Sequence, residues 1–323
     1  MTAHDKLRVA LLGADEESGL LLGALVDDAR VGDVYLAERD EKLVAPLTRR
    51  WGIIKRTVAD WRELLREETV DVVWIAGPLS ASPEAAGAAL AAGKHVVLAG
   101  PPRSAVDLQL LVQAARKAPG RLRVALPHLY NPTVVKARQV VAAGDVGELQ
   151  LGQALALMPA EAGKTGAKSG LAAAFTAIYV LQDFLGPATS VAASADPGEK
   201  LVGATLQHAA ALSTLTAGGL DAEARPVQER RLVGTEGTLL LRDDPEDELP
   251  LIGLRGEEFI PIPVRVPLHV YPYAVAQAAH ALVDSLLAEK DNEETLEAAF
   301  QALATARALD ESVRSGRRVT VEE

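Results

Sequence analysis

The chain has 323 residues, of which 49% are hydrophobic and 24% are charged, and its formal net charge at pH 7 is −11. This composition is typical of a globular protein long enough for two domains, and the negative charge argues against a nucleic-acid-binding protein, which needs a basic surface. Cysteine is absent, which excludes disulfides and thiolate chemistry, and because no apolar run is long enough to cross a membrane, we expect a cytoplasmic protein without a membrane partner.

Short apolar segments alternate with helical segments along the first part of the chain. Strands are expected at 6–12, 34–37, 70–76, 95–98 and 122–126, and helices at 18–26, 42–51, 60–67, 83–92 and 106–118. Strands that alternate with helices indicate a parallel sheet with right-handed crossovers. We therefore predict a doubly wound α/β domain over residues 1–125, in which ligands bind at the carboxyl ends of the strands.

The loop after the first strand resembles a dinucleotide-binding turn only in part. A dinucleotide fingerprint reads G-x-G-x-x-G, whereas this loop has Gly13 at the first position, Asp15 at the second and Ser18 at the third. An aspartate at the second position crowds and repels a diphosphate. Acids at a helix start also stabilise the helix dipole, so a well-capped helix that binds no phosphate is the alternative.

The end of the second strand indicates how a nucleotide ribose would be recognised. Glu38 lies where an acid would hydrogen-bond a ribose hydroxyl, and the adjacent Arg39 could instead accept a 2′-phosphate, so NAD and NADP both stay open. A solvated polar loop is the alternative. The predicted cofactor-binding residues follow the strand ends: Gly13, Ala14, Asp15, Glu38, Arg39, Gly77, Pro78 and Gly100.

The second half of the chain reads as a sheet with helices. Helices are expected at 133–143, 171–185, 273–288 and 296–315, and strands at 149–158, 191–195, 201–215, 226–234 and 238–242. A polar loop is expected at 160–170, an acidic hairpin or loop at 243–248, and a strand or extended tail at 318–321. Successive strands joined by short turns indicate a predominantly antiparallel sheet. We predict an α+β domain over residues 126–323.

Few side chains in this half suggest chemistry. None of the six histidines has a metal-binding spacing with acids, so no metal site is predicted. His128 alone falls near the predicted ligand crevice and is a candidate acid or base; its alternative is a capping or packing role. Lys164 and Lys168 belong to the polar loop at 160–170, either on a mobile surface or as ligands for an anionic substrate.

Four stretches carry a family resemblance, in the same order as in the family. They are VVWIAGP at 72–78, AALAAGKHVV at 88–97, VGTEGTL at 233–239 and ATARALDESVRSGRRV at 304–319. Together they resemble the Gfo/Idh/MocA family of NAD(P)-dependent sugar and polyol oxidoreductases. The resemblance implies an N-terminal Rossmann domain that binds NAD or NADP, and a C-terminal open-faced sheet that forms a homodimer or larger oligomer.

The departures from the family fall on its catalytic positions. Where the family has Glu-Lys-Pro, with the lysine near the nicotinamide, this chain has Gly100 at the lysine's place. The stretch that corresponds to the family's Asn-Arg-Phe lacks the arginine and has His128 and Tyr130. The family's Asp-x-Gly-x-His-x-x-Asp helix aligns with 172–179, so that Thr176 and Tyr179 replace the histidine and the second aspartate; a register shifted by three residues puts Tyr179 and Gln182 there.

Two functions are therefore open. The first is a divergent oxidoreductase that acts on a sugar, polyol or related small carbonyl compound, with the usual mechanism impaired. The second is a non-catalytic relative that binds a nucleotide, a sugar or a protein. The predicted residues for a small-molecule substrate are Tyr130, Lys164, Lys168, Thr176 and Tyr179.

Overall fold

A computed structural model of the chain describes residues 6–15, 18–67, 69–77, 83–100, 105–159, 167–198, 200–220, 226–242, 249–265, 267, 269–288 and 293–322. The chain divides into two compact units, Met1–Pro127 with Pro272–Phe300 and His128–Tyr271 with Gln301–Glu323. Residues 272–300 therefore pack with the first unit, although they follow most of the second unit in sequence.

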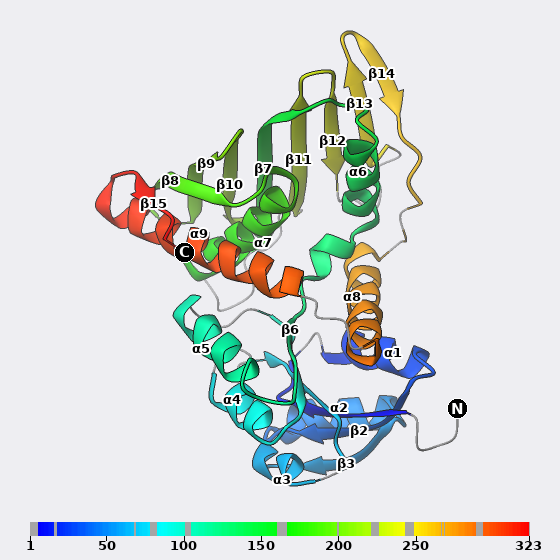
Figure 1. Cartoon of the computed structure of the whole chain (residues 1–323). Coiled ribbons are helices and arrows are strands. Elements are labelled where there is room, and N and C mark those ends of the chain that lie inside the picture. Colours follow the sequence, from blue (N-terminus) through cyan, green and yellow to red (C-terminus); the bar gives the residue numbers. More distant parts are fainter. Residues whose placement is uncertain are drawn as a thin grey trace. The chain divides into compact units, whose positions relative to one another are not determined.

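The first unit is built on a parallel six-stranded sheet with the strand order β3-β2-β1-β4-β5-β6 (Figure 1). Its strands are β1 (Leu7–Leu12), β2 (Val31–Ala37), β3 (Ile54–Val58), β4 (Val72–Ile75), β5 (His95–Leu98) and β6 (Leu122–Val124). Its helices are α1 (Ser18–Asp27), α2 (Glu41–Arg50), α3 (Trp61–Leu65), α4 (Pro83–Ala91), α5 (Ala105–Ala115), most of α8 (Val270–Leu287) and the first part of α9 (Glu293–Ser315). The strand order reverses between β1 and β4, and such a reversal opens a crevice at the carboxyl ends of the two strands. The predicted doubly wound fold is confirmed.

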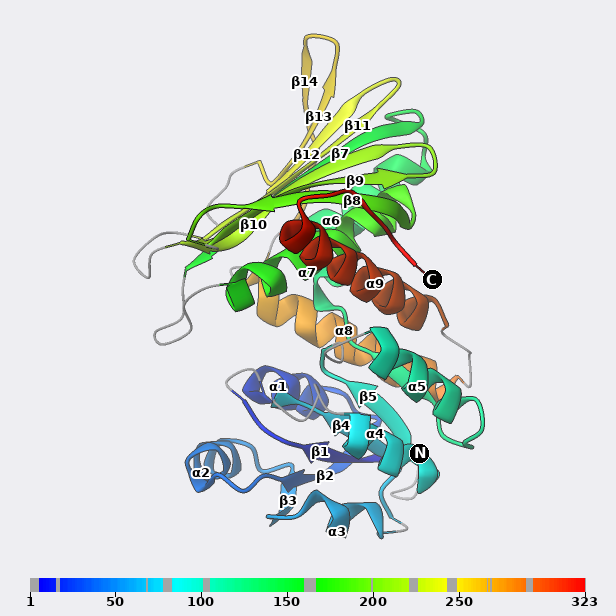
Figure 2. The same ribbon diagram turned by 90° about the vertical axis from the view of Figure 1, so that its left-hand side faces the viewer.

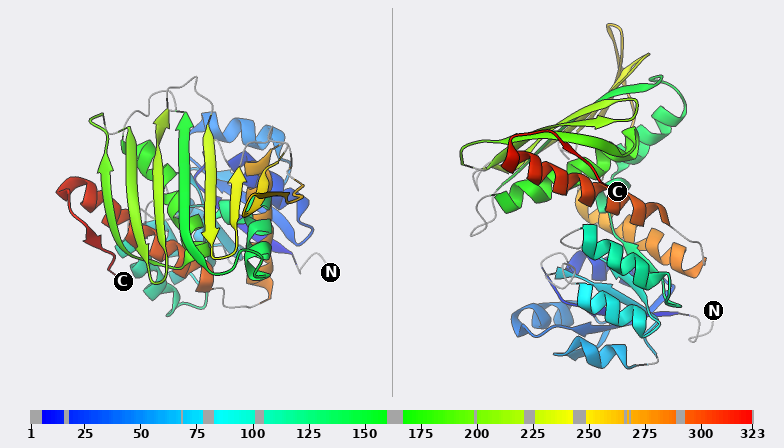
Figure 3. Two further views of the ribbon diagram at one scale, coloured as in Figure 1. Left: turned by 90° about the horizontal axis from the view of Figure 1, so that it is seen from above. Right: turned by 60° about the vertical axis from the view of Figure 1, so that its left-hand side comes forward.

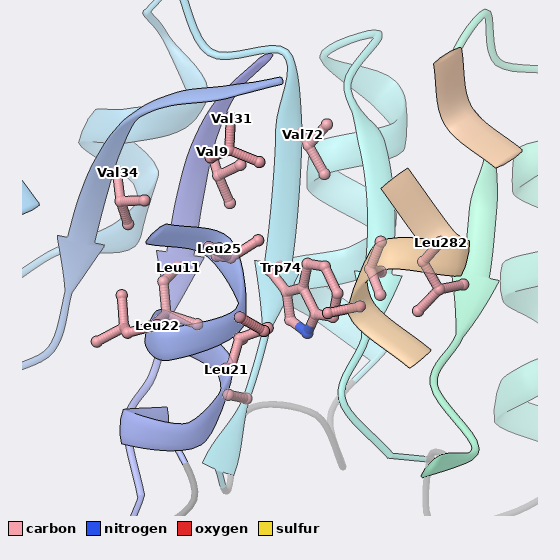
Figure 4. Packing of buried hydrophobic residues seen from close by; sticks show 14 of the residues in the cluster. Val9, Leu11, Leu21, Leu22, Leu25, Val31, Val34, Val72, Trp74 and Leu282 are labelled. Atoms are coloured by element: carbon pink, nitrogen blue, oxygen red, sulfur yellow. The ribbon is translucent and has the colours of Figure 1, made fainter. Parts of the chain in front are cut away.

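The core of this unit includes residues from the sheet and from helices α1 and α8. Leu21, Leu22 and Leu25 of α1 and Leu282 of α8 belong to one buried cluster with Trp74 of β4 (Figure 4). Fully burying one leucine side chain contributes about 1.5–3 kcal/mol. This packing fixes α1 against the sheet, and with it the turn that joins β1 to α1.

The second unit carries a nine-stranded mixed sheet with the strand order β14-β13-β12-β11-β7-β10-β9-β8-β15. Its strands are β7 (Leu149–Pro159), β8 (Ala188–Ala195), β9 (Leu201–His208), β10 (Leu212–Leu220), β11 (Val227–Gly234), β12 (Thr238–Arg242), β13 (Leu251–Arg255), β14 (Glu258–Pro261) and β15 (Val319–Thr320). Among the described strands of this second sheet, only β7 and β10 pair in parallel. The predicted, predominantly antiparallel sheet is confirmed.

Helices cover one face of this sheet and leave the other uncovered in the part of the chain that is described (Figures 2 and 3). They are α6 (Pro132–Ala142), α7 (Ala167–Leu185) and the part of α9 (Glu293–Ser315) that belongs to this unit. Helix α7 approaches β7 very closely: a Cβ on Gly152 would lie 2.6 Å from Leu185 Cδ1 and 2.9 Å from Leu181 Cδ2. The glycine therefore permits this helix–strand contact.

Several predicted elements differ from the structure. The single strand expected at 201–215 is wrong, because β9 ends at His208 and β10 starts at Leu212. The turn between them is three alanines, which give no turn signal. Strands β3, β13 and β14 were not predicted, and α7 starts at Ala167, inside the expected loop. The loop expected at 243–248 lies outside the described residues.

Candidate functional site

The turn between β1 and α1 is held by the side chains of Asp15 and Ser18. The Ser18 hydroxyl donates a hydrogen bond to Asp15 Oδ1 (2.9 Å) and accepts one from the Asp15 N–H (3.0 Å). Asp15 Oδ2 accepts a hydrogen bond from the Gly77 N–H at 3.1 Å. Asp15 therefore connects the carboxyl end of β1 to the carboxyl end of β4, at the point where the strand order reverses.

Two glycines allow the backbone to follow this path. Gly13 and Gly77 have φ angles of 77° and 57°, in the left-handed region that glycine occupies without strain. A Cβ on Gly77 would lie only 2.8 Å from the Ala14 carbonyl oxygen. The end of β4 thus passes directly against the β1–α1 turn, and only glycine fits there.

The carboxylate of Glu38, just after β2, faces the same turn. Its Oε2 accepts a hydrogen bond from the Ala14 N–H (2.9 Å), and its Oε1 accepts from the N–H groups of Arg39 (2.7 Å) and Asp40 (2.9 Å). A carboxylate oxygen can accept two hydrogen bonds, so Oε2 keeps one acceptor position. The Arg39 side chain donates from Nε to the Ala59 carbonyl (3.3 Å).

The structure thus brings most of the predicted cofactor residues together at one edge of the sheet. Hydrogen bonds join Ala14 and Arg39 to Glu38, and Gly77 to Asp15. Gly13 precedes Ala14 in the same turn. Gly100 follows β5, the neighbour of β4, and a Cβ there would meet nothing within 4 Å. Pro78 lies outside the described residues.

In the second unit, aromatic rings gather around His128. The ring centroids of His128 and Tyr271 are 5.2 Å apart, and those of His128 and Tyr179 are 6.3 Å apart. Phe175 lies 5.3 Å from Tyr179, one turn earlier on α7, in an edge-to-face arrangement. We call His128, Phe175, Tyr179 and Tyr271 the aromatic cluster.

The aromatic cluster includes two of the predicted functional residues, His128 and Tyr179. It adds two that were not predicted, Phe175 and Tyr271. Tyr271 is far from the others in sequence, and no local pattern marks it; the four-residue spacing of Phe175 and Tyr179 was visible but reads equally as helix packing. An imidazole beside two phenols can exchange protons and hydrogen-bond a hydroxylated ligand.

The remaining predicted residues have separate positions. Tyr130 is half-buried at the end of the 3-10 turn η2 (Pro127–Tyr130), and burial raises the pKa of its phenol. Thr176 is half-buried on α7. Lys168 lies on α7 with its side chain outside what is described, and Lys164 lies wholly outside it.

Metal-binding clusters and membrane-spanning helices are both absent from the part of the chain that the structure describes. No three acidic or histidine side chains there come close enough together to hold a metal ion. None of the described helices is both long and apolar enough to span a membrane.

Comparison with known proteins gives matches over one unit in sequence and over both units in structure. Residues 8–126 match the family model described as "Oxidoreductase family, NAD-binding Rossmann fold". A levoglucosan dehydrogenase of Pseudarthrobacter phenanthrenivorans is 29% identical over 115 residues, which make up 35% of this chain and only 29% of that protein.

Three solved structures show the same fold over nearly all of the chain. An NAD binding oxidoreductase from Klebsiella pneumoniae has a TM-score of 0.84 at 22% identity and covers 98% of this chain and 100% of its own. Levoglucosan dehydrogenase in complex with NADH has a TM-score of 0.83 at 19% identity, with 98% and 100% coverage. An apo scyllo-inositol dehydrogenase from Lactobacillus casei has a TM-score of 0.82 at 19% identity, with 98% and 99% coverage.

Proposed function

We propose that this chain is an NAD-dependent oxidoreductase that acts on a sugar, polyol or related small carbonyl compound. The premise is that residues 8–126 belong to the Gfo/Idh/MocA oxidoreductase family, which has an NAD-binding Rossmann fold. The family model confirms the resemblance over the two motifs that it covers, at 72–78 and 88–97. The substrate class comes from the similar structures, which include a levoglucosan dehydrogenase and a scyllo-inositol dehydrogenase, and the cofactor from the NADH that the former holds. The observation that supports the proposal best is the Gly13–Gly77 arrangement at the reversal point of the sheet.

The residues at this edge fit a dinucleotide in two respects. Glycine at position 77 lets the end of β4 pass directly against the β1–α1 turn, where a side chain would collide with Ala14. Glu38 keeps an acceptor position at the end of β2, where a ribose hydroxyl would donate. A carboxylate held by three backbone N–H groups also repels a 2′-phosphate, which favours NAD over NADP.

The aromatic cluster is the part of the chain that we propose for substrate binding and proton transfer. Bound NAD supplies a nicotinamide C4 that exchanges a hydride. His128 would exchange a proton with a substrate hydroxyl or carbonyl oxygen, since the imidazole is the side chain best suited to this near neutral pH. The hydroxyls of Tyr179 and Tyr271 would orient the substrate, with Tyr130 and Thr176 as further candidates beside Lys164 and Lys168.

A second candidate function is binding without turnover, and one residue favours it. Gly100 takes the place that the family resemblance assigns to a lysine, and glycine can neither donate a proton nor polarise a hydroxyl. Losing a positioned acid or base costs about 10²–10⁴-fold in rate. Such a protein would bind NAD and a ligand but reduce or oxidise the ligand slowly.

The two functions are separated by measuring binding and turnover on the same protein. NAD, NADH, NADP and NADPH are added separately in a thermal unfolding assay, in which a ligand at 100 times its Kd stabilises by about 2.7 kcal/mol. Nicotinamide absorbance is then followed with a panel of sugars and polyols. Stabilisation by NAD or NADH with turnover supports the oxidoreductase; stabilisation without turnover supports the binding protein. No stabilisation by any of these dinucleotides would contradict the oxidoreductase and favour a non-catalytic relative that binds a sugar or a protein.

As the partner we propose a second copy of this chain, bound through the uncovered face of the nine-stranded sheet. This face presents a mixture of uncharged and charged side chains that includes Gln153, Leu155, Thr216 and Arg231. Thr216→Glu would place a carboxylate in the middle of the face while leaving the helix-covered side unchanged. Light scattering should then show monomers where the unsubstituted chain forms dimers or larger oligomers; an unchanged mass would contradict this interface.

A further inference from the structure

Two backbone N–H groups at the carboxyl ends of β1 and β4 are hydrogen-bonded to acidic side chains of this chain. The Gly77 N–H donates to Asp15 Oδ2 (3.1 Å), and the Ala14 N–H donates to Glu38 Oε2 (2.9 Å). Both N–H groups belong to the edge at which the strand order reverses. Backbone N–H groups at a turn that leads into a helix attract anions, because the helix dipole adds positive potential there. Here the anions are two carboxylates of the protein itself.

Asp15 is held in this position from both sides. Its Oδ1 accepts the Ser18 hydroxyl at 2.9 Å while its Oδ2 accepts the Gly77 N–H. Ser18 is only 2% exposed, and Asp15 is half-buried. Charges in partly buried surroundings interact more strongly than in water. A diphosphate at this turn would therefore meet a fixed negative charge and would also have to displace it from Gly77.

Glu38 differs from Asp15 in what a ligand would require of it. The Glu38 carboxylate lies at the ribose position, and it can accept a hydroxyl hydrogen bond without leaving its backbone partners. Asp15 has no such complementary role toward a phosphate, because a carboxylate only accepts hydrogen bonds. The two acids thus have opposite expected effects on NAD affinity.

We propose that Asp15 is the residue that limits the affinity of this chain for its dinucleotide: its carboxylate takes the place of the diphosphate on the Gly77 N–H, and NAD binds only after this side chain has turned away. The inference rests on the proposed function, since it assumes that the dinucleotide binds at this edge. The Asp15 carboxylate and the diphosphate would compete for the same place, so removing the carboxylate should strengthen NAD binding.

The experiment measures the Kd of NADH and NAD by calorimetry on the full chain and on three variants. In Asp15→Gly the charge and the competing acceptor are both removed, and the Kd should fall about tenfold or more, which corresponds to about 1.4 kcal/mol per factor of ten. In Asp15→Asn the charge is removed but an amide oxygen can still accept from Gly77, so the Kd should fall by less.

The matched control is Asp196→Asn in the second unit. Asp196 also accepts hydrogen bonds from backbone N–H groups in a turn, from Gly198 at 3.0 Å and from Leu201 at 2.6 Å. This variant therefore loses the same charge from a similar turn that belongs to the other unit. Its Kd for NADH should equal that of the unsubstituted chain. A fall as large as that of the Asp15 variants would show an effect of net charge and overturn the inference.

The remaining outcomes distinguish this inference from the proposed function. If the unsubstituted chain and both Asp15 variants bind NADH equally well, Asp15 does not limit affinity and only the inference fails. If Asp15→Gly and Asp15→Asn bind more weakly, Asp15 supports the ligand and the inference is again overturned. If none of them binds NAD, NADH, NADP or NADPH, the proposed function fails together with it. Should Asp15→Gly not fold, the Asp15→Asn result decides.

Discussion

Replacing Gly77 by alanine tests how closely β4 and the β1–α1 turn approach each other. Gly77 has φ of 57°, and an alanine there would carry a Cβ 2.8 Å from the Ala14 carbonyl oxygen and 3.3 Å from its carbon. The left-handed conformation alone costs an L-residue about 1–2 kcal/mol. Relieving the contact requires moving the Ala14 backbone, whose N–H is bonded to Glu38. We expect a total loss of about 2–4 kcal/mol in the free energy of unfolding.

The matched control is Gly87→Ala in α4. A Cβ on Gly87 would meet nothing within 4 Å, and alanine is the better helix former, so this variant should gain about 0.5–1 kcal/mol. Both variants are measured by urea unfolding followed by circular dichroism, and NADH binding is measured on each. The reasoning would be refuted if Gly77→Ala were as stable as the unsubstituted chain, or if both variants changed in the same direction.

Three other predictions concern stability and turnover. Burial lowers the pKa of His208 and His95, so below the ordinary histidine pKa of 6.5 the unfolded chain binds protons that the folded chain does not. The free energy of unfolding should therefore fall as the pH drops below 6.5, and His208→Gln should make the melting temperature depend less on pH. Arg30→Met should lower the free energy of unfolding, measured in urea, by about 2–3 kcal/mol. It leaves the Asp28 carboxylate, which is 6% exposed, without the guanidinium whose Nη2 and Nε donate to it at 2.6 and 2.8 Å, and Arg30→Lys should lose less. Where turnover is found, His128→Ala should lower the rate about 10²-fold in the absorbance assay, and an unchanged rate would remove His128 from the mechanism.

The parallel sheet could be predicted because its central strands are almost wholly apolar. Strands β1, β4 and β5 are buried on both faces and stand out in the sequence as short hydrophobic runs between helical segments. Strand β3 could not be predicted in this way, because it lies at the edge of the sheet and its three middle residues are exposed and polar. A run of hydrophobic residues reflects burial on both faces, so an edge strand, which is only partly buried, shows no such run.

The hairpin between β9 and β10 shows a different limit. The apolar pattern continues from one strand into the next, and Ala209 and Ala210 give no sign of the reversal. The pairing of Leu212 with Gln207 defines the position of the turn, and this pairing is known only from the structure. A prediction from neighbouring residues alone therefore gives one long strand in place of β9 and β10.

The candidate site could be predicted where function depends on consecutive residues. The substitution of Asp15 for glycine was visible, but its partner Gly77 lies on another strand, so the carboxylate's hydrogen bond to that backbone required the structure. The same holds for Tyr271, which meets His128 through folding and not through spacing.

The two ends of the nine-stranded sheet bear on how this protein avoids aggregation. An unprotected edge offers its backbone to other chains as a template for fibril-like pairing. At one end β15 covers part of β8 through Val319 and Thr320. At the other, β14 is short, exposed along its length, and bounded by Glu258 and Pro261, a charge and an imino acid that discourage further strands. Deleting β15 would uncover the β8 edge and so favour insoluble assemblies, even though the remaining sheet is left intact.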